Sequence, residues 1–176
     1  ISIGPGSFTG LRIGIATAKM LSYALSIPVV AVSSLEAMAY HYPVPGVYVA
    51  SVLDAQKSNA YFALYEWNGK GFDEKKQTCV MDFEEVVKYC STLDKPVVFV
   101  GDIAQKKAEI IAQYENVSLG LPHLCMPRAS NVAMAAKARF ENEDYDNIMD
   151  LEPVYIRRSE AEVLWEKRHG EKLTDL

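Results

Sequence analysis

Hydrophobic and polar positions change their spacing several times along the chain, and these changes predict alternating strands and helices. The first 45 residues predict strands over 1–4 and 28–32, and helices over 10–25 and from Ser33 onward. Ser7 or Thr9 is the expected cap of the first helix. Glu36 follows Ser33 by three residues, the spacing of a capping box. Residues 42–46 contain two prolines and a glycine, so we expect the second helix to end there and a boundary between lobes to follow.

The pattern after residue 46 favours strands first and helices later. Apolar runs and alternation predict strands over 47–53, 60–67, a further stretch ending near 81, 96–101, and brief ones at 117–119 and 154–156. Asn68 and Gly69 lie in a hairpin turn between two of them. Helices are predicted over 82–91 with Asp82 as cap and Glu85 completing a box, over 102–114 with Asp102 as cap, over 130–142 with Ser130 or Asn131 as cap, and over 159–168. This order of elements indicates a mixed α/β fold.

Charge is unevenly distributed along the chain. The 176 residues hold 18 Lys and Arg against 23 Asp and Glu, a formal net charge of -5, and 49% of residues are hydrophobic. An acidic chain lacks the clustered basic surface that phosphate contacts need, so we do not expect it to bind nucleic acid alone. Residues 1–66 carry only three basic and three acidic residues. That part is therefore expected to be buried on more than one side, either by its own fold or by a partner.

Residues that could carry catalysis are sparse. Three separate cysteines without a CxxC pair argue against a disulfide scaffold or a zinc ribbon and suit a reducing cytoplasm. The three histidines His41, His123 and His169 stand apart, so no metal site is predicted. Asp54 and Asp102 follow predicted strands, where α/β proteins often place functional carboxylates, but turn formation and helix capping explain them as well. No uncharged stretch is long enough for a membrane-spanning helix.

A glycine-rich loop joins the first strand to the first helix. Its candidate anion-binding residues are those whose backbone amides or hydroxyls could face a phosphate: Gly4, Gly6, Ser7, Thr9 and Gly10. The loop lacks the lysine of a P-loop, and its spacing is GxGxxxG rather than the dinucleotide GxGxxG. A plain structural turn and a nucleotide-phosphate cradle both remain open.

The helix after this loop has a face of small residues. Gly10, Gly14 and Ala18 are four residues apart, a spacing that lets another backbone approach closely. Arg12 and Lys19 share another stripe of the same helix. These five residues are a candidate partner interface, and close packing on the chain's own sheet is the alternative.

Four blocks of sequence resemble one known family. They are GPGSFTGLRIGIATAKMLSYALSIPVVAVSSLEAMA (4–39), LDAQKSNAYFALY (53–65), PVVFVGD (96–102) and LEPVYIRRSEAEVLW (151–165). The first block is similar to the signature of the TsaB family, also called YeaZ. The resemblance spans the chain, and its first block is the most specific.

The resemblance implies an α/β fold of the actin/Hsp70-like ATPase type, with two ribonuclease-H-like lobes. Family members carry further strands and a helix before the glycine loop, so the amino-terminal lobe is expected to be incomplete in this chain. On this basis residues 1–45 are the remainder of the first lobe, 46–150 the second lobe, and 151–176 a carboxy-terminal segment that packs back towards the first.

The resemblance also implies a function. The family acts in forming threonylcarbamoyladenosine in tRNA beside the anticodon, as a noncatalytic cytoplasmic activator that pairs with its catalytic paralogue TsaD and works with the ATPase TsaE. No intrinsic cofactor is expected, ATP or ADP could lie at the complex interface, tRNA would be met only through the complex, and no membrane is involved. A homodimer is a further option for the free protein. The alternatives are a glycoprotease-like metalloenzyme and a stand-alone nucleotide-binding ATPase.

Overall fold

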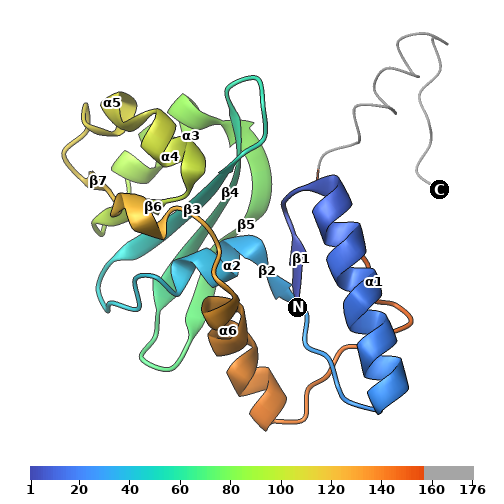
Figure 1. The fold of residues 1–176 in the computed structure, drawn as a ribbon. Helices are drawn as coiled ribbons and strands as arrows, with labels where there is room; N and C mark the ends of the chain where they lie inside the picture. Colours follow the sequence, from blue (N-terminus) through green and yellow to red (C-terminus); the bar gives the residue numbers. More distant parts are fainter. Residues whose placement is uncertain (157–176) are drawn as a thin grey trace, which may run out of the picture.

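The larger of the two β-sheets has five strands. The computed structural model describes residues 1–156. In sheet order the strands are β5 (Phe72–Asp82), β4 (Asn59–Trp67), β3 (Tyr48–Asp54), β6 (Val97–Val100) and β7 (Val117–Leu119). The strands β3, β4 and β5 form an antiparallel meander, whereas β6 and β7 run parallel to β3 (Figure 1). The predicted hairpin at Asn68 and Gly69 is confirmed, and Gly69 has a φ of 96°.

Both faces of this sheet are covered, as β3 shows. Ala50 and Val52 face one hydrophobic core, and Val49 and Leu53 face a second core on the opposite side. Alternate residues of a strand point to opposite faces, so a strand buried on both sides reads as a continuous apolar run. The run at 47–53 in the sequence has this physical origin.

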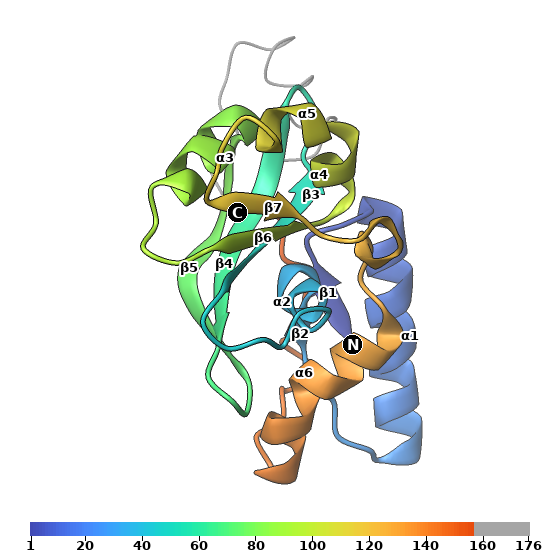
Figure 2. The ribbon, with the colours of Figure 1, turned by 90° about the vertical axis from the view of Figure 1, so that its left-hand side faces the viewer.

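Helices from the second half of the chain cover the first of these faces. They are α3 (Phe83–Ser91), α4 (Asp102–Lys106) and α5 (Ala108–Ile111), and Figure 2 shows them grouped together on the sheet. The fully buried rings of Phe62, Phe83 and Phe99 lie in this core. Burying such a side chain completely contributes about 1.5–3 kcal/mol relative to leaving it exposed.

A smaller sheet holds the glycine loop. Its strands β1 (Ser2–Gly4) and β2 (Val32–Ser33) run parallel. On one side of β1 lies α1 (Phe8–Leu25); α2 (Ser34–Ala39) and α6 (Ala129–Glu141) lie on the other (Figure 1). The 3-10 turn η1 (Pro122–Leu124) lies between β7 and α6. Val30, Val32, Ala37 and Ala135 form a small core here, so α6 packs on α2 and β2. The division of the chain at residues 45 and 150 stays a prediction.

Three predicted helix caps are confirmed. The Ser7 side chain accepts a hydrogen bond from the backbone N–H of Gly10 at 3.3 Å, so Ser7 rather than Thr9 caps α1. Ser33 caps α2, and Asp82 caps α3 by accepting from the N–H of Glu84 at 2.9 Å. These caps depend on residues two or three positions apart, which is why the sequence alone could identify them.

Two other caps were predicted wrongly. Asp102 is the first residue of α4 and not its cap, since Gly101 holds that position. The single helix expected over 102–114 is two short helices, α4 and α5, interrupted at Lys107, whose φ is -121°. Arg128 precedes α6 and no side chain caps it, so neither Ser130 nor Asn131 has the predicted role.

The remaining differences concern short strands. Of the strand expected over 28–32, only Val32 lies in a strand, namely β2. Val29 instead forms an isolated bridge with Asp146. Residues 154–156 form no strand, although the N–H of Val154 donates to the carbonyl of Ile3 at 2.8 Å. The helix predicted over 159–168 lies outside the described residues.

Candidate partner surface and glycine loop

The glycine loop begins with Gly4, at a position that only glycine can occupy without strain. Gly4 has a φ of 112°, and a Cβ there would lie 3.0 Å from a methyl carbon of Leu11 and 3.3 Å from the carbonyl oxygen of Val154. Gly4 is buried, whereas Gly6 and Ser7 are exposed. The loop therefore has a structural role at its start and an open surface at its end.

The exposed end of the loop coincides with the N-terminus of an 18-residue helix. Thr9 and Gly10 lie in its first turn and are exposed. Amide groups at a helix N-terminus carry partial positive charge and favour anions. Ser7 already engages the N–H of Gly10, so the first-turn amides offered to a ligand are fewer than the sequence suggests. Nucleotide binding at this loop stays a prediction.

One side of α1 packs on the chain's own sheet. Ile15 and Ser22 are buried, and the Ser22 hydroxyl donates to the carbonyl of Ile27 at 2.6 Å. A Cβ added at Gly14 would lie 3.8 Å from the Cδ1 of Ile1, so this glycine lies beside the start of the chain. Ala18 is half-buried. The face of small residues thus turns partly towards the chain itself.

A second side of α1 carries a segment from far along the sequence. The ammonium group of Lys19 donates to the carbonyls of Met149 and Leu151, both at 3.1 Å. The guanidinium group of Arg12 donates to the Tyr155 hydroxyl at 2.8 Å and lies 3.9 Å from the ring centroid of Phe8. The two basic residues of the helix therefore hold residues 149–155 along it, which their seven-residue spacing could not reveal.

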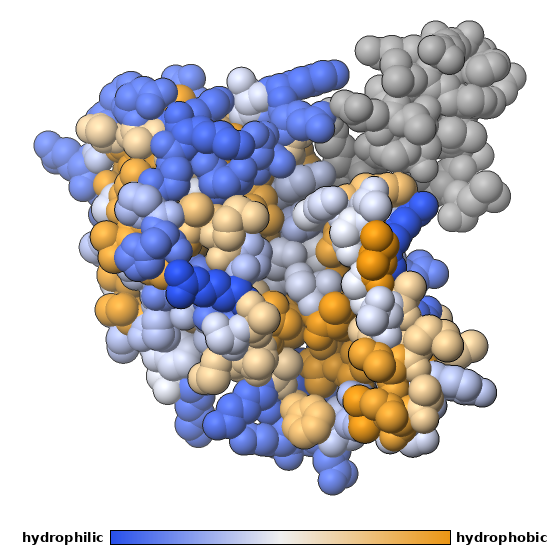
Figure 3. Space-filling model, in the orientation of Figure 1, coloured by the Kyte–Doolittle hydropathy of each residue, from blue (hydrophilic) through white to orange (hydrophobic). Residues whose placement is uncertain are grey.

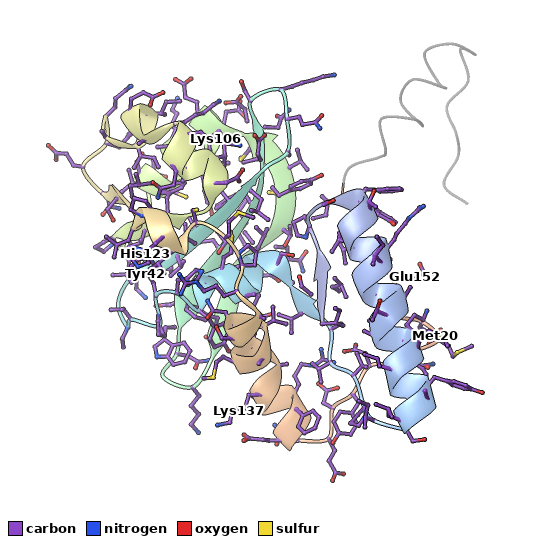
Figure 4. All side chains as sticks on the ribbon, viewed as in Figure 1. Met20, Tyr42, Lys106, His123, Lys137 and Glu152 are labelled. Carbon is purple, nitrogen blue, oxygen red and sulfur yellow. The ribbon has the colours of Figure 1, made fainter. Side chains whose placement is uncertain are left out.

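The outward side of α1 is exposed and uncharged. It consists of Ile13, Thr17, Met20 and Ala24, which recur at the spacing of one helical stripe. The side chains of Ile13 and Met20 are 63% and 64% exposed. Met20 points away from the rest of the molecule in Figure 4, and Figure 3 shows hydrophobic side chains gathered over this part of the molecule. We call these four residues the outward stripe. The outward stripe was not predicted from the sequence, although its uncharged 4-3-4 spacing was a usable signal.

An apolar groove of about 600 Å³ lies between α1 and α6. Leu21 and Ile27 line it from the α1 side, and Met134 and Phe140 from α6. Lys137, labelled in Figure 4, also lines the groove, and its ammonium group lies 3.7 Å from a carboxylate oxygen of Glu141. Together with the outward stripe, this groove makes α1 the most exposed apolar element among residues 1–156.

Asp54 and Asp102, the two candidate carboxylates, are brought together at the carboxyl ends of β3 and β6. The ammonium group of Lys106 lies 2.9 Å from a carboxylate oxygen of each. The Asp102 carboxylate also accepts from the N–H of Asp54 at 3.0 Å. The hydrogen bond from Lys106, with one from the N–H of Gln56, lowers the pKa of Asp54, while the two carboxylates raise the pKa of Lys106. Lys106 was missed, although its position four residues after Asp102 was a signal.

The close approach of β3 and β6 beside this charge cluster depends on a glycine, Gly101. Gly101 has a φ of 136°, and a Cβ there would lie 1.6 Å from the carbonyl oxygen of Val52. The backbones of β3 and β6 therefore meet too closely for any side chain at this position. The cluster holds the start of α4 against the end of β3, an arrangement that accounts for its charges without a ligand.

The histidines of the described residues occupy different surroundings. His41 places one ring nitrogen 3.0 Å from the carbonyl oxygen of Met126 and the other 3.0 Å from the side-chain nitrogen of Asn131. His123 lies in η1 and is exposed, whereas His169 lies outside the described residues. Within residues 1–156, no three His, Cys, Asp or Glu side chains are grouped closely enough to hold a metal ion. The same residues contain no helix long and apolar enough to cross a membrane.

Comparison with protein families gives a match over most of the chain. The model described as "TsaD: tRNA N6-adenosine threonylcarbamoyltransferase" matches residues 1–165. The chain is 25% identical to YeaZ from Pseudomonas aeruginosa, with a TM-score of 0.72 over 88% of this chain and 70% of that one. Fold and family model together define an α/β protein of the actin-like ATPase class.

Curated relatives narrow this class. Over 94% of its length the chain is 31% identical to the tRNA threonylcarbamoyladenosine biosynthesis protein TsaB of Bacillus subtilis (strain 168), of which it covers 71%. It is 28% identical to the protein of the same name from Escherichia coli (strain K12), over 96% of this chain and 73% of that relative. The chain belongs to the TsaB family, also called YeaZ. The predicted family and fold class are both confirmed.

Proposed function

We propose that this protein is a noncatalytic subunit of the assembly that forms threonylcarbamoyladenosine in tRNA beside the anticodon. It activates a TsaD-like catalytic paralogue by pairing with it, and a TsaE-like ATPase completes the assembly. Support comes from relatives named as biosynthesis proteins of this nucleoside. The outward stripe of α1 is the observation that supports the pairing role, because an exposed and uncharged helix face can pack against a second helix.

The physical case for pairing through α1 is its low desolvation cost. Nothing charged lies in the stripe, so a partner helix would displace water from Ile13 and Met20 without stripping any ion. Complete burial of either side chain would contribute about 1.5–3 kcal/mol. Two small residues, Thr17 between them and Ala24 one turn after Met20, leave room for a close approach. Of the five residues first predicted for the interface, Gly10 lies nearest to this surface, beside the helix start.

The test is binding to the TsaD-like paralogue from the same organism, measured by calorimetry. Ile13→Asp and Met20→Asp should each raise the dissociation constant at least about tenfold, because each buries a charge at the interface. Leu121→Asp is the matched control, since Leu121 is also a large apolar residue, 55% exposed, but lies beyond β7. Gly14→Leu is less suitable, because its side chain would meet Ile1.

Function is then tested by reconstituting tRNA modification from purified components. Omitting this protein should abolish most product, and the two stripe variants should reduce product in proportion to their weakened binding. Full modification without the protein, or equal binding by Ile13→Asp and wild type, would reject the proposal.

The glycine loop supports a second candidate, a nucleotide-binding ATPase. The exposed Ser7 and Thr9 stand at the N-terminus of α1, where a phosphate would be stabilised. In our proposal ATP or ADP binds only at the interface of the complex. ATP turnover by the isolated protein that is lost in Ser7→Glu would favour the ATPase instead, because a carboxylate there would repel phosphate.

A further inference from the structure

The tip of the hairpin between β4 and β5 contains an asparagine followed by a glycine. Among the six asparagines of the sequence, Asn68 alone precedes a glycine. Asn68 and Gly69 are exposed, and nothing lies within 4 Å of a Cβ added at Gly69. The Gly69 N–H makes no hydrogen bond to any group of residues 1–156. The nitrogen of Gly69 is therefore both accessible and unpaired within the described chain.

The Asn68 side chain is fixed by three hydrogen bonds. Its Oδ1 accepts from the N–H of Lys70 at 3.0 Å and from the N–H of Gly71 at 2.9 Å. Its Nδ2 donates to a carboxylate oxygen of Asp73 at 2.7 Å. Bonds of this kind curl an asparagine side chain forward over the peptide that follows it, which here contains the Gly69 nitrogen. The two N–H donors also polarise the side-chain carbonyl and stabilise negative charge on Oδ1.

We propose that Asn68 is a site of self-modification, at which the side-chain amide becomes a carboxylate without an enzyme. The Gly69 nitrogen forms a bond to the side-chain carbonyl carbon of Asn68, and the bond from that carbon to Nδ2 breaks. Nδ2 leaves as ammonia, taking up the proton that the Gly69 nitrogen gives up, and a cyclic imide remains. Water then opens the imide. Opening at the side-chain carbonyl yields aspartate, and opening at the main-chain carbonyl yields isoaspartate.

Both products disturb the contact between this hairpin and α2. Trp67 pairs with Phe72 next to the turn, and the Tyr40 ring at the end of α2 lies 6.0 Å and 5.1 Å from their rings. Aspartate replaces the amide that donates to Asp73 with a second carboxylate, so an attraction becomes a repulsion. Isoaspartate adds a methylene carbon to the backbone of the turn. The modified turn therefore holds Trp67 and Phe72 less firmly against Tyr40.

A second exposed asparagine is a matched control within the same molecule. The Oδ1 of Asn147 accepts from the N–H of Met149 at 3.0 Å, and its Nδ2 donates to Asp150 at 2.7 Å. Ile148 follows it, and its branched side chain crowds the attacking nitrogen. Peptide mapping of the full chain by mass spectrometry, during incubation at neutral pH, measures conversion at both sites. Asn68 should convert at least about tenfold faster than Asn147. Equal rates, or no conversion at Asn68, would overturn the proposal.

Unfolding separates the contribution of the hairpin from that of the sequence. In guanidinium chloride the chain loses the hydrogen bonds to the Oδ1 of Asn68, while the glycine that follows it is unchanged. The ratio of the Asn68 rate to the Asn147 rate should then fall at least about threefold. A ratio that stays the same or rises on unfolding would show that the folded hairpin does not promote the reaction.

Fluorescence tests the effect of the modification on the hairpin. The chain has two tryptophans, so Trp67 is observed alone in the full-length Trp165→Phe variant. Its emission should shift to longer wavelength in step with conversion, because the loosened ring becomes more hydrated. Asn68→Asp adds the charge without lengthening the backbone, so its shift should be smaller than that of fully converted protein. Complete conversion with unchanged emission would overturn the loosening of the hairpin.

Discussion

The five-stranded sheet and helix α1 use similar residues in opposite ways. In the sheet, apolar side chains such as those of Val52 and Phe62 are fully buried between packed layers. In α1, Ile13 and Met20 are equally apolar and mostly exposed. An apolar run in the sequence therefore indicates burial somewhere, but it does not say whether the covering surface belongs to the same chain.

The largest expected contrast between the two regions is in stability. Phe62→Ala should lower the free energy of unfolding by about 3–5 kcal/mol, because it leaves a cavity in the core under α3. Met20→Ala on α1 should change it by less than about 0.5 kcal/mol, since the side chain packs on little. Denaturant unfolding of both variants measures the difference. Comparable losses would show that α1 is as well packed as the sheet.

The close approach of β3 and β6 should be nearly as sensitive. Gly101→Ala is expected to cost about 3 kcal/mol or more, because its Cβ would overlap the carbonyl of Val52 and its φ is unfavourable for alanine. Gly46 is the matched control: its φ of 79° is also positive, but nothing lies within 4 Å of a Cβ there. Gly46→Ala should cost only about 1 kcal/mol, from backbone strain alone. Thermal unfolding of the two proteins would reveal whether the overlap matters.

Removing the helix caps in the same two regions should cause smaller losses of stability. Asp82→Ala should destabilise the protein by about 1–2 kcal/mol, because α3 packs in the main core and its cap bond is 2.9 Å long. Ser7→Ala should cost about 0.5 kcal/mol, since the bond to Gly10 is longer, at 3.3 Å, and exposed. Urea unfolding provides both values. The reverse order would contradict the difference in packing.

The smallest expected effect is a dependence on pH at Asp54. Its folded-state pKa is lowered, chiefly by the hydrogen bond from Lys106, so its stabilising contribution is complete above the unfolded pKa of about 3.8. That contribution is lost as the pH falls through the lower folded value. The stability difference between wild type and Asp54→Asn should therefore be constant between pH 5 and 7 and shrink below about pH 4. A difference that grows on acidification would show that Asp54 is not ion-paired as described.

Local signals in the sequence predicted much of this fold. The meander, its turn at Asn68 and Gly69, and the caps Ser7 and Asp82 depend on neighbouring residues and were predicted correctly. The role of Asp102 was not, because its carboxylate bonds to the N–H of Asp54, 48 positions earlier. The beginning of α6 was also missed, and the Asn131 side chain there lies against His41 from the end of α2. Such long-range partners compete with local capping and leave no periodic trace.

The same limit applies to the candidate surface. Spacing on a helix showed that Arg12 and Lys19 share a stripe, but not that residues 149–155 already occupy it. It placed Gly10, Gly14 and Ala18 together, but not the position of Gly14 beside Ile1. Which neighbour covers each side of a helix is decided by the path of the chain.

The outer strand of the large sheet bears on how the protein behaves at high concentration. The N-terminal half of β5 carries Asp73, Glu74, Lys75 and Lys76, and its register with β4 shifts near Leu64. Charged side chains and an irregular, twisted border discourage a strand of another molecule from extending a sheet. Fibrillar stacking through β5 would require these four ionic groups to lose their hydration, so crowded solutions of the folded protein should resist amyloid growth from that border.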